Sequence, residues 1–396
     1  MKRFLLLLLG SITLNSVPAQ AAPSVVIKPL TSSTLAPGAE GFALSGKSAV
    51  TFANVVNTTS DVVVTAHDAS GVQTWSRTID SSVDEVAMAI ASDALGNIYL
   101  AGVTADIAPS ETPTSTVGVD NPDGVQVDNL IRIRRDLNSI AIWKLSPTGE
   151  LISTFQSPQG SVALINAMSA TASGVSIVGA ISAKPFLLTL STSGQFGKLY
   201  SLGTDKTEFN DCNRMSDGST YIYGSSAETL QGKKVAGKVD GILLTVDKNN
   251  KVTQFVRSSA PKALRAWQSA DPTFVATGEV ITGKVTETAI TQFTKAFKPT
   301  WTLRIPSAGI SRVVSANGIT YLAFSSKSAI TGVSGWKPSS TQLVVLAFDA
   351  KGVIKSAYSF TALTSPIALR FTRESGVVGM AEGAANSVSI FRITSR

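Results

Sequence analysis

The chain has 396 residues, of which 43% are hydrophobic and only 15% are charged, and its formal net charge is +7. An average soluble domain has about 25% charged residues, so charge is sparse, but the hydrophobic fraction excludes a disordered protein. The single cysteine, Cys212, excludes an internal disulfide. Together with the single histidine, His67, it also excludes a His/Cys metal cluster. The composition therefore favours a large folded protein with few side chains suited to catalysis.

The start of the chain is typical of an export signal. Lys2 and Arg3 form a positive segment, a leucine-rich run follows, and the sequence AQA at 19–21 fits a small-residue cleavage site. No later stretch reaches the length of about 18 apolar residues that a membrane-spanning helix needs. We therefore expect a signal peptide at 1–21 and a single domain at 22–396 without a membrane span. The expected location is secreted, periplasmic or on the cell surface.

A segment made of an apolar strand, a polar turn and a second strand recurs along the chain. The copies start at Val62, Ile140, Phe186, Ile242, Ala289 and Leu343, and a truncated copy starts at Val388. A second recurring pair of strands, clearest in MAIASDALGNIYLAG at 88–102, lies between these copies and ends near glycine. Seven pairs of each kind predict seven four-stranded units of about 54 residues, slightly longer than the blades of known propeller repeats.

These units favour a closed ring. Short alternating strands bounded by Gly, Asp, Asn and Ser turns are typical of antiparallel hairpins, and a ring of such sheets buries their faces and leaves only short edges. The last unit lacks its outer strand, and the segment SVVIKPL at 24–30 is a strand without a partner. The sequence thus predicts an all-β, seven-bladed β-propeller of four-stranded antiparallel blades, closed by the N-terminal strand at 24–30. An open β-solenoid is the alternative.

The segment TWSRTIDSSVDEVAMAIASDALGNIYLAGVT at 74–104 resembles the repeat of a bacterial β-propeller family found in exported proteins. The matching positions are Trp75, Asp84, Glu85, Asp93, Gly96, Asn97, Ile98, Tyr99, Gly102 and Thr104. The next segment, IAIWKLSPTGELI, is also similar to the family's strand end, while the pattern is lost around Pro272 and Ala323. The resemblance implies a propeller, but no activity, since propellers serve both binding and catalysis.

Insertions fall mainly between the second and third strands of the units, at 105–138, 225–241 and 325–342. This places them on one face of a ring, where long loops often carry function; solvated decoration is the alternative. The longest insertion holds spaced aspartates and three arginines, but not the spacing of an EF-hand. Trp336 lies in 325–342 and either stacks on a sugar or partner surface or lies under its own loop.

Four arginines recur shortly before the inner turns of the last four predicted units: Arg214, Arg265, Arg312 and Arg370. If their side chains point into the central channel, they form a basic half-ring, and converging guanidinium groups bind carboxylate or phosphate. Local pairing of each arginine with Asp217, Asp271 or Glu374 is the alternative.

Residues for catalysis are scarce. His67 fits a turn histidine, Cys212 fits a buried and inert thiol, and Asp84 and Glu85 occupy positions of the repeat. We therefore predict no catalytic residue, no metal and no cofactor. After removal of the signal the net charge is only 32 − 27 = +5, and basic residues do not alternate with aromatic ones, which argues against nucleic acid as a partner.

The sequence favours an exported, monomeric binding scaffold without enzymatic activity. We expect its loop face to engage an extracellular or cell-envelope protein or an anionic glycan, with the four arginines and Trp336 as candidate ligand-binding residues. The alternative is a carboxylate-dependent propeller enzyme, a glycan hydrolase or lyase, and a purely structural surface protein is a third possibility. An enzyme requires two carboxylates, or arginines and a carboxylate, that converge in one pocket, whereas a binding module exposes Trp336 and apolar loop residues.

Overall fold

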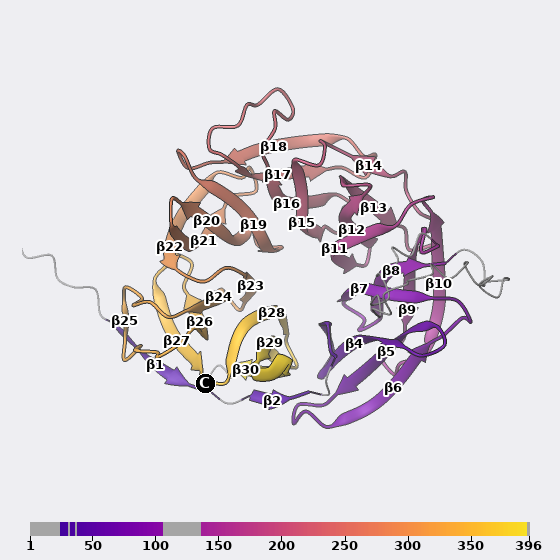
Figure 1. Ribbon diagram of the computed structural model, residues 1–396, viewed down its shortest axis with the longest axis horizontal. Helices are drawn as coiled ribbons and strands as arrows, with labels where there is room; N and C mark the ends of the chain where they lie inside the picture. The colour runs from indigo at the N-terminus through magenta and orange to yellow at the C-terminus, as the bar shows by residue number, and fades with distance from the viewer. Residues whose placement is uncertain (1–23, 31, 36–37, 106–135, 394–396) are drawn as a thin grey trace, which may run out of the picture.

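The computed structural model describes residues 24–30, 32–35, 38–105 and 136–393. The predicted signal peptide and nearly all of the insertion at 105–138 lie outside these ranges. Within them the chain forms β-sheets that stand around a common centre as a ring (Figure 1), with one 3₁₀ turn at Ala384–Asn386. The described part of the chain holds no helix of the length and apolar character needed to span a bilayer.

Five sheets are built from four consecutive strands each, paired antiparallel from the innermost to the outermost. The first holds β3 (Gly41–Ser45), β4 (Ser48–Val56), β5 (Ser60–His67) and β6 (Gln73–Ile79). The second holds β7 (Glu85–Ser92), β8 (Ile98–Thr104), β9 (Ser139–Leu145) and β10 (Leu151–Pro158). The third holds β11 (Ala163–Thr171), β12 (Gly174–Ile181), β13 (Lys184–Leu190) and β14 (Tyr200–Ser201). The fourth holds β15 (Thr207–Arg214), β16 (Thr220–Ser226), β17 (Asp240–Val246) and β18 (Val252–Ser258). The fifth holds β19 (Leu264–Asp271), β20 (Val275–Thr282), β21 (Val285–Phe293) and β22 (Pro299–Pro306).

Two further sheets combine strands from both ends of the described chain. A sixth four-stranded sheet holds β28 (Leu363–Thr372), β29 (Gly376–Gly383), β30 (Val388–Ile393) and, as its outer strand, β2 (Ser32–Thr34). The larger sheet has six strands in the order β23 (Ser311–Ala316), β24 (Ile319–Ser326), β26 (Gln342–Phe348), β27 (Ile354–Phe360), β1 (Val25–Pro29) and β25 (Val333–Ser334).

The predicted number of seven four-stranded blades is wrong. The described chain has six such blades, because the remaining sheet gains β1 and β25 and so has six strands. The strand at 24–30 does not complete the last blade. Instead β1 pairs parallel with β27, with Ile27 opposite Ala357, and β25 covers its other edge. The short strand β2 closes the last blade against β30. The physical reason is apolar packing, since Val25 and Ile27 join a cluster with Trp336 and other side chains of the larger sheet.

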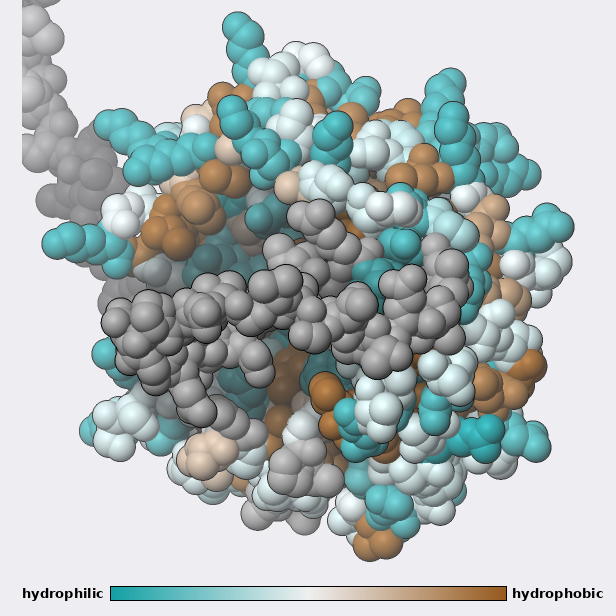
Figure 2. All heavy atoms as spheres, turned by 45° about the vertical axis from the view of Figure 1, so that its right-hand side comes forward, coloured by the Kyte–Doolittle hydropathy of each residue, from teal (hydrophilic) through white to brown (hydrophobic). Residues whose placement is uncertain are grey.

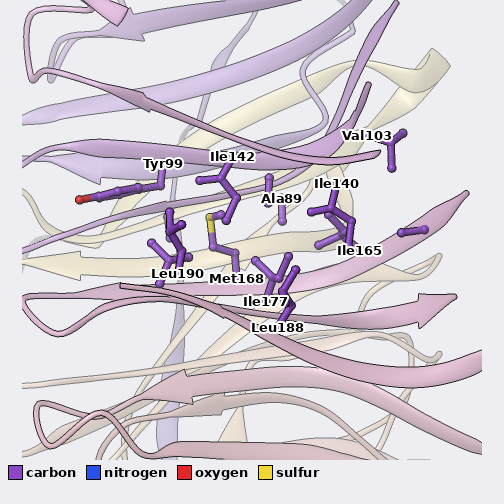
Figure 3. Packing of buried hydrophobic residues seen from close by; sticks show 14 of the residues in the cluster. Ala89, Tyr99, Val103, Ile140, Ile142, Ile165, Met168, Ile177, Leu188 and Leu190 are labelled. Carbon is purple, nitrogen blue, oxygen red and sulfur yellow. The ribbon is translucent and has the colours of Figure 1, made fainter. Parts of the chain in front are cut away.

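Apolar side chains fill the space between neighbouring sheets. Figure 3 shows one such interface, in which Tyr99 and Ile142 of the second sheet face Ile177 and Leu190 of the third, with Met168 among them. Full burial of one such aliphatic side chain stabilises a fold by about 1.5–3 kcal/mol. On the face shown in Figure 2, hydrophobic residues are scattered in small groups among hydrophilic ones. Within the described ranges, the larger clusters of buried apolar residues each join two adjacent sheets.

Two outer-strand tryptophans connect their blades to a turn of the next blade. A Cβ atom on Gly149 would lie 2.6 Å from the ring of Trp75, and one on Gly352 would lie 2.8 Å from the ring of Trp301. Nε1 of Trp301 also donates a hydrogen bond to the Ala350 carbonyl at 3.1 Å. The equivalent positions of the two tryptophans in the sequence predict packing between blades, and these contacts confirm it.

Candidate functional site

The inner strands of five blades carry a β-bulge near their middle. The extra residues are Met88, Asn166, Asn210, Gln268 and, in β28, Ile367. In four of these blades a glycine on the second strand stands beside the bulge, at Gly102, Gly179, Gly224 and Gly278, whereas β29 has Ala381 there. A Cβ atom at these glycines would lie between 1.9 and 2.0 Å from a backbone oxygen of the inner strand. In these four blades the close approach of the bulged inner strand is therefore the physical reason for the glycine within the second strand.

The polar bulge residues hold neighbouring blades together. Asn166 and Asn210 each donate from Nδ2 to a carbonyl of the next inner strand, at 2.8 and 2.9 Å. Gln268 accepts at Oε1 from the backbone N–H of Ser311 at 3.0 Å. All three amides also line a central cavity of about 200 Å³. The blade-to-blade hydrogen bonds thus fix three amide side chains at the wall of the channel.

The larger sheet departs from this pattern. Ala323 stands in place of the glycine and pairs with Arg312 without a shift of register. Arg312 takes the position of the bulge residue, and its Nε donates to the Ile367 carbonyl of β28 at 2.7 Å. Its Nη1 donates to the Ser311 carbonyl at 3.0 Å. The strand without a bulge therefore places a long cationic side chain where three of the other blades have an amide, and Arg312 lines the central cavity.

Two more charged groups meet Arg312 in the channel. Arg370 of β28 and Asp211 of β15 line both the central cavity and its continuation toward the inner turns. Nη1 of Arg370 donates to its neighbouring Leu369 carbonyl at 3.1 Å. The two carboxylate oxygens of Asp211 accept backbone N–H groups, from Cys212 at 2.8 Å and from Ala270 at 2.7 Å. The channel thus holds two guanidinium groups and one deep carboxylate.

The burial of these groups shifts their pKa values. Burial raises the pKa of the Asp211 carboxyl above its ordinary value, while the Ala270 N–H and the charge of Arg370 act in the opposite direction. Burial lowers the pKa of Arg370, an effect that Asp211 opposes, and burial likewise lowers the pKa of Arg312. An arginine stays charged at neutral pH. The two guanidinium groups therefore carry charge in a poorly solvated place, where an anion gains more from meeting them than it does in water.

The four arginines of the sequence prediction do not form a half-ring. Arg312 and Arg370 reach the channel, but Arg214 turns to the neighbouring sheet, where its Nε donates to Ser173 Oγ at 3.0 Å. Arg265 lies over the ring of Trp267, with its guanidinium carbon 4.3 Å from the ring centroid. Burial lowers the pKa of Arg265 to about 10.

The position of each arginine relative to the bulge of its strand explains why Arg214 and Arg265 do not reach the channel. Arg265 precedes its bulge residue, Arg214 ends its strand beyond the bulge, and only Arg312 occupies the bulge position itself. Side chains alternate between the two faces of a strand, so positions that match loosely in the sequence point to different places. Within the described ranges, none of the four arginines forms an ion pair with the three carboxylates that the sequence offered as local partners.

Trp336 is not an exposed stacking surface. Its side chain is only 8% exposed, and its Nε1 donates to the Ser328 carbonyl at 2.8 Å. The ring packs with Val25 and Ile27 of β1. The insertion at 325–342 therefore folds over its own tryptophan and holds the N-terminal strand in place, which is the second of the two alternatives left by the sequence.

The remaining candidate groups have structural surroundings. His67 ends β5, and its Nδ1 lies 3.3 Å from the Gly71 carbonyl of the following turn, as expected for a turn histidine. Cys212 is buried, and burial raises the pKa of its thiol well above the ordinary range. The ranges that the structure describes contain no group of three or more His, Cys, Asp or Glu side chains arranged to hold a metal ion.

Sequence reasoning missed Asp211 and the three amides of the channel. The signal available was a polar residue inside an otherwise apolar inner strand, as in ALINAM, EFNDCN and AWQSAD. In the sequence, such a residue only interrupts the alternating pattern. The bulge that turns its side chain toward the channel depends on pairing with a glycine of the next strand. Only the paired strands show that these interruptions share one position.

Comparison with solved structures finds β-propellers. The WD40 domain of Neurospora crassa Pan2 is similar with a TM-score of 0.51 at 8% identity, covering 94% of this chain and 98% of that one. The β-propeller domain of the Trilobed protease from Pyrococcus furiosus is similar at 0.49 and 9% identity, with 91% and 96% covered. BBS1N in complex with ARL6DN is similar at 0.49 and 11% identity, with 94% and 98% covered. No known protein family and no curated protein matches the chain. The similarity shows a β-propeller, and it does not confirm the narrower resemblance to the bacterial exported repeat family.

Proposed function

We propose that this protein is an exported, non-enzymatic binding scaffold that engages an extracellular or cell-envelope partner through one face of its ring. We call this the loop face: it carries the connections from the second to the third strands and the entries to the inner strands. β-Propellers commonly serve as interaction scaffolds, although the fold alone does not specify a function. The surface that this face offers therefore decides whether it can bind a partner.

The observation that carries the proposal is the shape of the channel mouth on the loop face. Two hollows adjoin the central cavity there, one of about 540 Å³ between the fourth and fifth blades and one of about 470 Å³ beside β28. Ile310 lines both hollows and is 45% exposed, while Arg312 lines both hollows and the central cavity. A concave surface that combines apolar side chains with a few fixed polar groups is the usual form of a binding site.

Introducing a negative charge on each face of the ring tests this proposal. The mature chain and the Ile310→Glu variant are immobilised and exposed to a labelled envelope and culture-medium fraction, and the bound material is quantified and identified. Leu95→Glu is the matched control, since Leu95 is 83% exposed on the turn between β7 and β8, on the opposite face. We expect Ile310→Glu to reduce binding at least tenfold and Leu95→Glu to leave it unchanged. Equal binding by all three proteins would remove the loop face as the site.

A second candidate function is a carboxylate-dependent hydrolase or lyase for an anionic glycan. It is favoured by one observation: Glu40 and Asp211 line the same cavity as Arg312 and Arg370. Two carboxyl groups that flank the scissile bond are what most glycoside hydrolases require. The measurement is the release of reducing or unsaturated ends from a polyuronate by the wild type and by Asp211→Asn. Turnover that Asp211→Asn abolishes would establish the enzyme, and a wild type without turnover would rule it out for this substrate.

A further inference from the structure

We propose that Arg312 and Arg370 form a subsite for the carboxylate of a single sugar acid, with the fixed amides of the channel as partners for its hydroxyl groups. This inference deepens the proposed function and rests on it for the direction of entry, since the hollows of the loop face lead to this cavity. The chemistry of the subsite itself follows from the channel residues.

The two guanidinium groups retain donors for a ligand. Within the described chain, Arg312 uses Nε and Nη1 for backbone carbonyls, and Arg370 uses Nη1. Each guanidinium has five N–H donors, so the Nη2 groups of both arginines stay available. Paired guanidinium groups in a poorly solvated site bind a carboxylate through short, charge-assisted hydrogen bonds.

The charge of the cavity favours a monoanion over a dianion. Two positive side chains line it, and Asp211 and Glu40 line it as well. A carboxylate adds one negative charge to this balanced set, whereas a phosphate dianion adds two and is repelled more strongly by the two protein carboxylates. We therefore assign the subsite to a carboxylate rather than to a phosphate.

The amides supply the second half of the recognition. Asn166 and Asn210 use their Nδ2 groups for blade-to-blade hydrogen bonds, which leaves each Oδ1 as an acceptor for a hydroxyl group. Gln268 uses Oε1, which leaves its Nε2 as a donor. Because these side chains are already fixed, a ligand pays little conformational entropy for ordering them.

The size of the cavity limits the ligand to one small ring. Its volume of about 200 Å³ is below the range of roughly 300–1,000 Å³ for sites of drug-sized ligands. The walls are polar at the arginines and amides, and Met88 and Met168 add apolar contact. A hexuronic acid, with one carboxylate and several hydroxyl groups on one ring, matches both the size and the chemistry.

Calorimetric titration of the mature protein with D-glucuronate tests the subsite directly. Acetate carries the carboxylate without hydroxyl groups, glucose carries hydroxyl groups without a carboxylate, and inorganic phosphate carries a larger charge. We expect glucuronate to bind at least tenfold more tightly than each of the other three. Binding of acetate or phosphate as tight as that of glucuronate would overturn the assignment to a sugar acid.

Substitutions locate the binding within the ring. Arg370→Gln is the main variant, because Arg370 bonds only to its own strand, whereas Arg312 joins two sheets. We expect Arg370→Gln to weaken glucuronate binding at least tenfold and Arg370→Lys to weaken it less. Arg77→Gln, on the exposed part of β6, removes the same charge outside the channel and should leave binding unchanged. Circular dichroism verifies that each variant is folded, and undiminished binding by Arg370→Gln would remove the channel as the site.

The two proposals fail separately. Free glucuronate reports on the channel alone, so its binding does not depend on Ile310 at the loop-face mouth. Loss of partner capture by Ile310→Glu with no binding of glucuronate would leave the scaffold and remove the sugar-acid subsite. Binding of glucuronate with no effect of Ile310→Glu would leave the subsite and remove the loop-face scaffold.

Discussion

The inner strands β15 and β23 stand at equivalent places in the ring but pair differently. In β15, Asn210 is an extra residue beside Gly224, whereas in β23, Arg312 pairs with Ala323 in regular register. The bulge presents a short amide that bonds to the next blade, and the regular strand presents a long cation that bonds across to β28 and reaches the channel. The departure from the repeat is thus what brings Arg312 into the channel, and functional sites are commonly such departures in otherwise consistent folds.

The largest effect is expected from filling the space beside a bulge. In Gly224→Ala the added Cβ would lie 1.9 Å from the Glu208 carbonyl oxygen, so the bulge must open. We expect the free energy of unfolding to fall by about 3 kcal/mol, at the upper end of overpacking costs, measured by urea denaturation. Ala323→Gly, in the sheet without this bulge, should cost only about 0.5–1 kcal/mol. Equal losses in the two variants would mean that the bulge does not demand the glycine.

A smaller effect is expected from removing the amide that the bulge presents. Asn210→Ala leaves the Trp267 carbonyl without its donor, and loss of one partner of a buried hydrogen bond costs about 1–3 kcal/mol. Urea denaturation should therefore show a loss within that range. Asn249→Ala, at an exposed turn, should change stability by less than about 0.5 kcal/mol. A loss for Asn210→Ala as small as that control would show that these amides do not hold the blades together.

The thiol of Cys212 reports on the bulged strand, since it lies two residues after Asn210 and is buried. Its raised pKa and burial predict no reaction with a chromogenic disulfide reagent in the native protein. We expect Gly224→Ala to speed labelling at least tenfold by opening the strand, and Ala323→Gly to leave the rate near that of the wild type. Fast labelling of the wild type would show that β15 opens without any substitution.

The smallest effect is expected in the pH dependence of stability. It differs between Asp211, a carboxylate in the channel, and Asp349, a carboxylate on the rim of the larger sheet. Backbone N–H groups of Val353 and Lys351 lower the pKa of Asp349, so its contribution to stability is present above its ordinary value of 3.8 and is lost as pH falls. Burial raises the pKa of Asp211, so its contribution is present below 3.8 and is lost as pH rises through the folded-state pKa.

Urea denaturation between about pH 3 and 7 measures how the stability contribution of each aspartate changes with pH. The difference in unfolding free energy between the wild type and Asp211→Asn should decrease with rising pH. The difference between the wild type and Asp349→Asn should increase with rising pH over the acid range. Parallel trends for the two variants would contradict the assigned environments.

Much of the ring could be predicted from local patterns. The way in which the N-terminal strands close the ring could not, and neither could the place of Asp211 and the amides in the channel. The hairpins, the face of the insertions and the packing of Trp75 and Trp301 follow from alternation, turn residues and repeat position. The segment at 24–30 shows an alternating strand, but alternation does not say which sheet edge accepts it. Likewise, Arg214 and Arg265 match the other arginines in sequence, but their place relative to the bulges turns them away from the channel.

By itself the sequence determined that this protein is built of repeated antiparallel hairpins, because strand alternation and turn residues act over a few neighbouring residues. The tertiary structure alone decided that β1 joins the larger sheet, where Val25 and Ile27 find Trp336, and that β2 closes the last blade. It also decided that Arg312, Arg370 and Asp211 share one cavity. Both outcomes depend on contacts between segments far apart in the chain, for which a local pattern carries no signal.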